Sequence, residues 1–481
     1  MVDLLPSDPA GLPEARRPAR LDLSDGATLD LTVTPVAKSL AGTTVRMLAY
    51  NGSVPGPTLS VRQGAELTVD VTNHGDLETT VHWHGLRLAN RFDGVPHETQ
   101  EPIPVGGAFS YVLRFPDPGL YWYHPHVRED YAQELGLYGT IVVAPAEPDY
   151  WPPADSDVVL TVDDLLLTDG EVPPFHHERT SHAAMGRFGT VFLTNGEPEP
   201  RLPARADEVL RLWLVNTANA RVFNLTLPGA RMKLVGGDSG RVEQEEIVSG
   251  VLLGPSERAV VDVLFERPGS LTLEHRTPER TVPLARFDVG GAPPGRDLVG
   301  RFELLRRAPE FAAERSGLPA WIDAAPDKVL ALVARMSGGG EHHHHHHAST
   351  ADGIEWEDEM PAVGSDAVRW LFVDRTDGTD QPVAGWRFRV GDRVKIRHVN
   401  ETHSDHPMHH PFHVHGAGRF LVLARDGVPE ANLVWKDTVL LRTGQTVDIL
   451  LDLTNPGLWM AHCHIPEHMH SGMMFGFTVE G

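Results

Sequence analysis

Residues 116–126 read PDPGLYWYHPH, and residues 454–464 read TNPGLWMAHCH. Both stretches run from a Pro-Gly-Leu turn through bulky residues to a His-x-His pair. A second His-x-His pair, followed by glycine, precedes each stretch: HWHG begins at His82 and HVHG begins at His413. This repeat near the two ends of the chain predicts two related domains.

The middle of the chain repeats this scaffold without the histidine pairs. The stretch LRLWLVNTANARVFNLTLPG, which ends at Gly229, has Phe223, Asn224 and Leu225 where the histidines are expected. The stretch ERPGSLTLEH at 266–275 keeps the Pro-Gly turn and retains one histidine, His275. The sequence therefore predicts three related domains, with metal ligands in the first and third.

Alternating apolar and polar residues recur along the whole chain, as in 27–34 (ATLDLTVT), 65–73 (AELTVDVTN) and 445–454 (QTVDILLDLT). A period of two is typical of strands that bury one face. Turn signals drawn from 46 glycines and 39 prolines separate these runs. Long helical periodicity is scarce, and its best candidate lies at 326–336. The chain is therefore predicted to be all-β, with sandwich-type domains.

Composition suggests the domain boundaries. A Pro-rich segment near 144–157 is the expected first linker, and the second connection, about 290–330, is rich in Pro and Gly and then partly helical. We expect a flexible loop at 338–353 around the run His342–His347, interpreted as a native metal-collecting tract with an affinity tag as the alternative. The expected domains are 20–148, 155–300 and 325–481.

Charge and cysteine content exclude several classes of function. The 481 residues carry 42 Lys plus Arg against 66 Asp plus Glu, a formal net charge of −24. Such an acidic chain repels nucleic acid and anionic lipid, so neither is an expected partner. No apolar run is long enough to span a membrane, and no export signal is present as written, so we expect a cytoplasmic protein unless a leader was removed. One cysteine excludes a disulfide within the chain, whereas histidines number 27.

The four His-x-His pairs are the candidate metal ligands. On a strand, residues i and i+2 point to the same face, so each pair directs two imidazoles into one space. Eight imidazoles exceed what one zinc or iron ion uses, and they suit three metal ions that share them as two, three and three. Imidazole favours copper among the first-row ions. The pairs are His82/His84, His124/His126, His413/His415 and His462/His464.

The only cysteine, Cys463, lies inside the last pair and must face away from its two neighbours on a strand. His468 and Met473 follow it, and His410 precedes the HVHG pair. One thiolate, two imidazoles and a distant thioether form the trigonal ligand set of a blue copper site. The sequence therefore predicts a second, separate copper site.

Three further histidines surround the HPFHVHG segment. A competing register that begins at His406 fails, because Pro411 then stands where a histidine is needed. We therefore expect His403, His406 and His409 to be structural residues and not ligands.

The motifs HWHG, HPH, HPFHVHG and HCHIPEHMHSGMM resemble the four copper motifs of the three-domain multicopper oxidases, the laccase family. The resemblance spans about residues 20–480 and implies three consecutive cupredoxin-like Greek-key β-sandwich domains with four copper ions. It assigns the type 1 copper to His410, Cys463, His468 and Met473, and the type 2 copper to His82 and His413. It assigns the type 3 pair to His84, His126 and His464 on one ion and to His124, His415 and His462 on the other.

The resemblance also implies a reaction: one-electron oxidation of phenols or aromatic amines, coupled to four-electron reduction of dioxygen to water. Each electron would enter at the type 1 copper through an exposed edge of His468 or His410. It would cross to the cluster through Cys463, which is bonded in sequence to a cluster histidine on each side. The Met473 thioether implies a low copper potential. A monomer suffices, since one chain carries both halves of the cluster.

Two other functions stay open on sequence grounds. One is a metallo-oxidase whose reductant is Cu(I), Fe(II) or Mn(II), which the acidic composition and the His-rich run favour. The other is a copper electron-transfer protein without oxidase turnover. The complete set of eight cluster histidines argues against the second.

By the same resemblance, Asp93 in the segment NRFDGVP would transfer protons near the cluster; the alternative is a plain Asp-Gly turn. Many bacterial relatives carry a glutamate directly after the last type 1 histidine for proton delivery, and this chain has Met469 there. Glu467 lies on the other side of His468 and is not expected to take that role.

Overall fold

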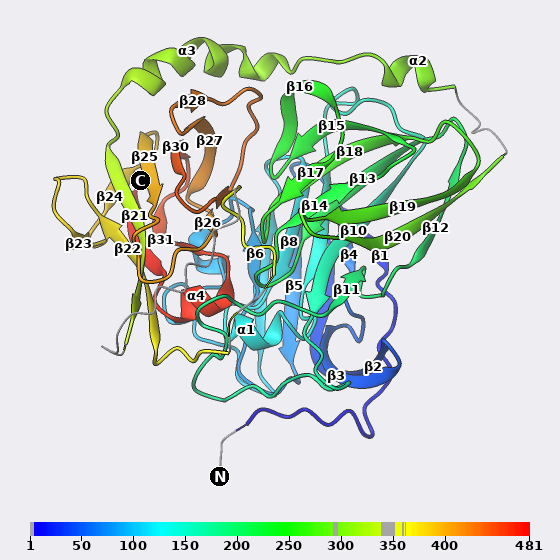
Figure 1. The fold of residues 1–481 in the computed structure, drawn as a ribbon, viewed down its shortest axis with the longest axis horizontal. Helices are drawn as coiled ribbons and strands as arrows, with labels where there is room; N and C mark the ends of the chain where they lie inside the picture. Colours follow the sequence, from blue (N-terminus) through cyan, green and yellow to red (C-terminus); the bar gives the residue numbers. More distant parts are fainter. Residues whose placement is uncertain (1–3, 292–296, 338–351, 358–359, 361) are drawn as a thin grey trace.

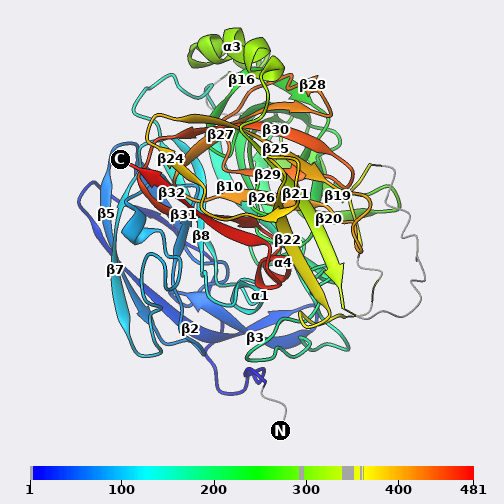
Figure 2. The same cartoon turned by 90° about the vertical axis from the view of Figure 1, so that its left-hand side faces the viewer.

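A computed structural model describes residues 4–291, 297–337, 352–357, 360 and 362–481. The described strands form six sheets, which follow one another along the chain as three pairs. Figures 1 and 2 show these pairs as three adjoining groups, blue to cyan, teal to green, and yellow-green to red. The predicted all-β fold of cupredoxin-like sandwiches is confirmed.

The first pair of sheets contains the N-terminal strands. In β5 (Glu66–Asn73) the predicted alternation buries Leu67, Val69 and Val71 in the core between the sheets. The four-stranded sheet has the order β3 (Thr43–Tyr50), β2 (Thr28–Leu40), β5 (Glu66–Asn73) and β7 (Ala108–Arg114). The five-stranded sheet has the order β1 (Arg20–Asp22), β4 (Thr58–Arg62), β9 (Gly139–Ala144), β8 (Gly119–His124) and β6 (His82–His84).

The second pair of sheets encloses its own core, which includes Leu212, Leu214 and Val261. The six-stranded sheet has the order β11 (Val191–Thr194), β10 (Ser156–Leu165), β13 (Val209–Asn216), β18 (Arg258–Leu264), β15 (Arg231–Gly237) and β16 (Gly240–Val248). The five-stranded sheet has the order β12 (Arg201–Arg205), β20 (Thr281–Gly290), β19 (Gly269–Arg276), β14 (Phe223–Thr226) and β17 (Val251–Leu253).

The third pair of sheets carries the C-terminal motifs on its smaller sheet. The seven-stranded sheet has the order β23 (Gln381–Pro382), β22 (Val368–Asp374), β21 (Lys328–Met336), β25 (Arg393–Asn400), β30 (Thr446–Leu453), β27 (Gly418–Arg425) and β28 (Val428–Pro429). The five-stranded sheet has the order β24 (Arg387–Arg389), β32 (Met474–Glu480), β31 (Gly457–Cys463), β26 (His410–Val414) and β29 (Thr438–Leu441).

Helices are few and short in the described residues, and none there is long and apolar enough to cross a membrane. The second connection carries α2 and α3, which run along the top edge in Figure 1. Of the expected loop at 338–353, only Asp352 and Gly353 belong to the described residues. The helices are η1 (Asn90–Phe92), α1 (Glu129–Ala132), α2 (Val299–Phe302), η2 (Pro309–Phe311), α3 (Ala312–Asp323) and α4 (Pro466–His470).

The candidate helix at 326–336 is wrong, because the structure forms β21 there. β21 pairs with β22 on one side and β25 on the other, and its residues 330–334 are all buried. A continuous apolar run is typical of a central strand covered on both faces, and periodicity alone does not distinguish such a strand from a buried helix.

Strand register relates the middle domain to the C-terminal domain. β14 pairs with β19 so that Leu225 lies opposite His275, and β26 pairs with β31 so that Phe412 lies opposite Cys463. His275 therefore occupies the position of Cys463. Leu225 on β14 then corresponds to Phe412 on β26, and Asn224 corresponds to Pro411; neither of these is a predicted ligand. Phe223, two residues before Leu225, corresponds to the predicted ligand His410.

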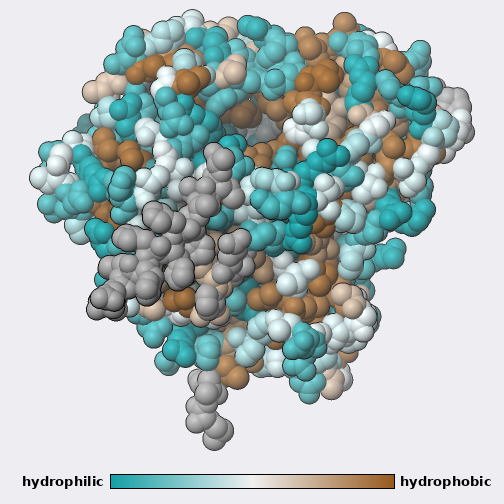
Figure 3. Space-filling model, in the orientation of Figure 1, coloured by the Kyte–Doolittle hydropathy of each residue, from teal (hydrophilic) through white to brown (hydrophobic). Residues whose placement is uncertain are grey.

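A cleft of about 360 Å³ opens between the second and third sandwiches, lined by Leu252, Val434 and Lys436 among others. Figure 3 shows this face hollowed near its upper centre, with hydrophilic and hydrophobic residues mixed around the hollow. Lys436 pairs with Asp238 and Glu257 at the base of the cleft, at 3.1 and 3.2 Å. The cleft therefore approaches the segment that leads into β29.

Candidate metal centre

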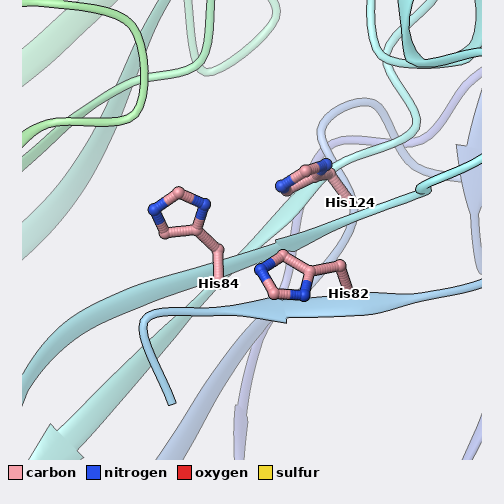
Figure 4. A group of neighbouring side chains, drawn as sticks. All are labelled: His82, His84 and His124. Atoms are coloured by element: carbon pink, nitrogen blue, oxygen red, sulfur yellow. The ribbon is translucent and has the colours of Figure 1, made fainter. Parts of the chain in front are cut away.

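Eight histidines converge where the small sheets of the first and third sandwiches meet. Figure 4 shows three of them, His82 and His84 from β6 and His124 from β8, with their rings close together. All eight side chains are at most 4% exposed. The predicted set is therefore brought together without exception: His82, His84, His124, His126, His413, His415, His462 and His464.

Strand pairing explains why the pairs meet. β6 and β8 are antiparallel with His82 opposite His124, and β26 and β31 are antiparallel with His413 opposite His462. Each sheet thus brings two His-x-His pairs side by side, with His126, His415 and His464 just beyond the ends of their strands. Trp122, two residues before His124 on β8, stacks on the His124 ring with ring centroids 4.2 Å apart.

The outer nitrogen of most of these rings is fixed by a hydrogen bond. The Nδ1 atoms of His82 and His413 lie 2.8 and 2.9 Å from the carbonyl oxygens of Asp93 and Asp437. Because a carbonyl oxygen only accepts, each of these Nδ1 atoms carries the proton. His124 and His462 make the same kind of contact at 2.9 Å, to the carbonyls of Pro125 and Cys463.

Several inner nitrogens have no hydrogen-bond partner among the described residues, although they are buried. These atoms include Nε2 of His82, His126 and His413 and Nδ1 of His84. A buried polar atom without a partner costs free energy unless something binds it. Neutral imidazoles with fixed tautomers and free inner nitrogens are the donor set that copper takes, so the residues present fit that metal.

Burial favours the neutral form of several cluster imidazoles. It lowers the pKa of His84, His413 and His464 well below the usual value, and the neighbouring histidines lower it further. Neutral imidazole is the form that binds metal ions. These three imidazoles are therefore in the protonation state that binds a metal ion.

The arrangement of the rings differs from the expected split of the type 3 ligands. The ligand nitrogens of His126, His415 and His462 lie within 4.8 Å of one another. Nε2 of His464 lies 3.4 Å from Nε2 of His124. His124 and His126 therefore exchange places relative to the expectation: β8 ends at His124, and His126 lies in the bend that follows, where its ring meets other partners.

Two aspartates hold the cluster from outside. Asp93 Oδ2 accepts from His415 Nδ1 at 2.8 Å, and its Oδ1 lies 3.4 Å from His82 Nδ1. Burial alone would raise the pKa of Asp93, but these two histidines hold it below its usual value. Asp437 Oδ1 accepts from His84 Nε2 at 3.0 Å and pairs with Arg258.

The second predicted site lies beneath β31. Cys463 Sγ is 3.5 Å from His410 Nδ1 and 3.7 Å from His468 Nδ1. Met473 is fully buried in the same core, and its carbonyl accepts from the Cys463 backbone N–H at 3.0 Å. Burial raises the pKa of the Cys463 thiol, so a bound cation is needed to stabilise the thiolate.

The expected exposed edge of His468 or His410 is wrong, since both side chains are at most 1% exposed. His468 Nε2 donates to the carbonyl of Ala184, in the middle domain, at 3.1 Å. Trp370 stacks on the other side of His468 with centroids 4.1 Å apart and donates to the carbonyl of Ala183 at 2.7 Å. A segment of the middle domain thus covers the ligand through which electrons were expected to enter.

The remaining histidines of this region lie outside the ligand groups found among the described residues. His409 is buried, and its ring lies between the backbone N–H of Glu355 and the carbonyl of Ala220. His406 packs against Trp370, and His403 is exposed beside Thr402.

Comparison with known proteins agrees with this geometry. Family models described as multicopper oxidase match residues 32–148 and 365–481. A copper resistance protein A homolog of Pseudomonas syringae pv. tomato is 32% identical, and the match covers 96% of this chain and 94% of that protein. The chain belongs to the multicopper oxidase family.

Other members of the family match over nearly the whole chain. Multicopper oxidase MmcO of Mycobacterium tuberculosis is 28% identical, over 96% of this chain and 88% of that protein. The solved structure of a multi-copper oxidase from Pseudomonas thermotolerans superposes with a TM-score of 0.70 at 27% identity, over 95% of this chain and 100% of that one. As a multicopper oxidase, this chain is a copper-dependent oxidoreductase that uses dioxygen.

Three residues beside this oxidase centre were not predicted. Glu129 Oε1 lies 2.9 Å from His126 Nδ1, and its acidic position three residues after the HPH motif was a usable signal. Asp437 and Trp370 come from segments without a metal-binding pattern, so the sequence alone offered no comparable signal for them.

Met469 and Glu467 are both buried in α4, and burial raises the pKa of Glu467 to about 8.

Proposed function

We propose that this multicopper oxidase binds four copper ions, one beside Cys463 and three in the histidine cluster. The partnerless inner nitrogens and the thiol between two imidazoles support this number. The type 1 ligands would be His410, Cys463, His468 and Met473, and the type 2 ligands His82 and His413. The type 3 ligands would be His84, His124 and His464 on one ion and His126, His415 and His462 on the other.

Copper would supply one-electron redox chemistry and the capacity to reduce dioxygen to water. The chain's part is to connect the two sites. Cys463 faces the first site, while its sequence neighbours His462 and His464 face the cluster, so covalent bonds join the sites without a gap. A buried thiol is thus linked directly to a cluster of eight histidines. This link is the observation that favours oxidase turnover over electron transfer without turnover. All the ligands come from one chain, so a monomer is sufficient.

The proposed reductants are phenols and aromatic amines that give up an electron readily. Because Ala184 covers His468, such a substrate would not touch the imidazole, and its electron would pass through the covering backbone. Substrates that need a close contact with this ligand should therefore react slowly.

A metal ion such as Cu(I) is the second candidate reductant. The covered His468 favours it, because a small ion can bind at the surface and deliver its electron without an aromatic pocket over the ligand. The copper resistance name of the relative at 32% identity points the same way.

Oxygen uptake by the copper-loaded protein tests the proposal, with a methoxyphenol and with Cu(I) in parallel and with autoxidation subtracted. Phenol-driven uptake with a weak Cu(I) response would support the first candidate, and the reverse would support the second. No uptake with either reductant, at full copper loading, would contradict turnover and leave an electron-transfer protein.

A further inference from the structure

We propose that Glu129 is a positioning residue for the copper ligand His126, and that His470 holds Glu129 in place. The proposal rests on the copper centre proposed above. It joins α1 of the first domain to α4 of the third, the helix that also carries His468. Nothing in the motif pattern assigns a role to either residue.

The two carboxylate oxygens of Glu129 are divided between two imidazoles. Oε1 lies 2.9 Å from Nδ1 of His126, and Oε2 lies 2.7 Å from Nε2 of His470. His126 Nδ1 therefore carries a proton and donates a hydrogen bond to the carboxylate. This fixes the tautomer in which Nε2, which has no hydrogen-bond partner, points towards His415 and His462.

Local structure places Glu129 for this role. Arg128 adopts a left-handed conformation with φ of 50°, which turns the chain after the HPH motif, and α1 begins at the next residue. Arg128 Nε then donates to Asp130 Oδ1 at 2.8 Å, so the guanidinium is engaged by the neighbouring carboxylate. Glu129, only 2% exposed, is left to face the imidazoles.

His470 completes the arrangement from the other domain. It lies at the end of α4, two residues after His468, and is 25% exposed. A displaced α4 would therefore release Glu129, and a released Glu129 would leave His126 free to rotate. Hydrogen-bonded carboxylates of this kind orient metal-binding histidines, and their loss typically costs about 10–100-fold in metal affinity or activity.

The test compares copper-loaded, full-length Glu129→Ala and Glu129→Gln with the control Glu101→Gln, which changes a carboxylate that is 86% exposed. Copper per chain, the electron paramagnetic resonance spectrum, and kcat and KM for dioxygen are measured. Glu129→Ala should lose copper or turnover by about 10–100-fold and gain a signal from uncoupled copper, while the blue absorption at Cys463 stays. Glu129→Gln should show a smaller change of the same kind, since its amide oxygen still accepts from His126.

A Glu129→Ala protein with the copper content, resonance spectrum and KM of the wild type would overturn the proposal. If the alanine variant also loses the blue absorption, Glu129→Gln decides: an altered cluster signal with intact blue absorption supports positioning, and a wild-type signal overturns it. A wild-type protein that holds no copper or consumes no dioxygen would instead contradict the proposed function, so the two failures are distinguishable.

Discussion

His275 and Cys463 occupy the same position in two copies of one fold, and their surroundings differ completely. Cys463 lies within 3.7 Å of two imidazole nitrogens. His275 lies among aromatic rings, with Phe223 5.0 Å and Trp356 5.8 Å away between centroids. Burial, followed by the charges of two nearby arginines, lowers the pKa of His275 to about 3. The shared strands supply a position, and the neighbouring side chains decide whether that position binds a metal.

The same comparison explains what the middle domain contributes. Its segment around Ala184 covers His468, and its Arg258 pairs with Asp437 behind His84. A domain without ligands thus shapes both copper sites from outside. At the compared position itself, a substitution of Cys463 should change copper chemistry, whereas a substitution of His275 should change stability alone.

Cys463→Ser should have the largest effect. Without the thiolate, the blue absorption should disappear and turnover should fall below detection, since the link between the sites loses its metal-binding end. Cluster copper should remain, because the flanking histidines face away from this site. Visible absorption, copper per chain and oxygen uptake measure these changes, and blue absorption that survives the substitution would contradict the assignment.

Asp93→Asn should leave copper content intact and slow the reduction of dioxygen by about 10–100-fold. The amide oxygen still accepts from His415, but the negative charge and the proton-accepting capacity are lost. Reoxidation of the reduced enzyme by dioxygen, followed in a single turnover, checks the step directly. Unchanged turnover would show that Asp93 takes no part in the reaction and is only part of an Asp-Gly turn.

His275→Phe should leave copper content, blue absorption and turnover unchanged. The substitution removes one hydrogen bond, which His275 Nδ1 accepts from the Asn224 backbone N–H at 3.1 Å. Leaving that donor unpaired should lower the free energy of unfolding by about 1–3 kcal/mol, measured by denaturant titration. Loss of blue absorption in this variant would break the comparison, because the middle position would then serve the copper sites.

Asp163, in β10 of the middle domain, should have the smallest effect on the copper sites and should act only on the pH dependence of stability. Burial raises the pKa of Asp163 to about 8, with Tyr138 donating a hydrogen bond to it at 2.5 Å. From roughly pH 4, where a free aspartate ionises, up to pH 8, the folded chain holds a proton that the unfolded chain has lost. Stability from this group is therefore complete below pH 4 and declines towards pH 8.

Asp163→Asn tests this by flattening the decline without altering copper content. Denaturant unfolding of the variant and the wild type at several pH values between 4 and 8 gives the comparison. Parallel pH profiles would show that Asp163 does not hold the proton.

The cluster histidines could be predicted because residues i and i+2 of an extended chain point the same way. Each His-x-His pair starts on a strand, although His126, His415 and His464 lie just beyond the strand ends. Cys463 and His468 were predictable for the same reason, from a chemically specific spacing. The type 3 split was not, because it depends on how the chain runs after β8 ends at His124. The segment that covers His468 could not be predicted either, because Ala183 and Ala184 act through backbone carbonyls, which leave no trace in the side-chain sequence.

A strand was mistaken for a helix only where the hydrophobic pattern has no clear period. The run at 329–334 is apolar throughout, so its period could not separate a central strand from a buried helix. Glu129 shows the opposite case, since its spacing from His126 was visible in the sequence and became meaningful once the short helix α1 was placed.

Anomalous diffraction at the copper edge, from crystals of the copper-loaded protein, tests the central claim most directly. We expect four peaks: one between Cys463, His410 and His468, and three among the cluster histidines, with the middle domain empty at His275. A map without a peak at Cys463, or with fewer than three in the cluster, would contradict the account.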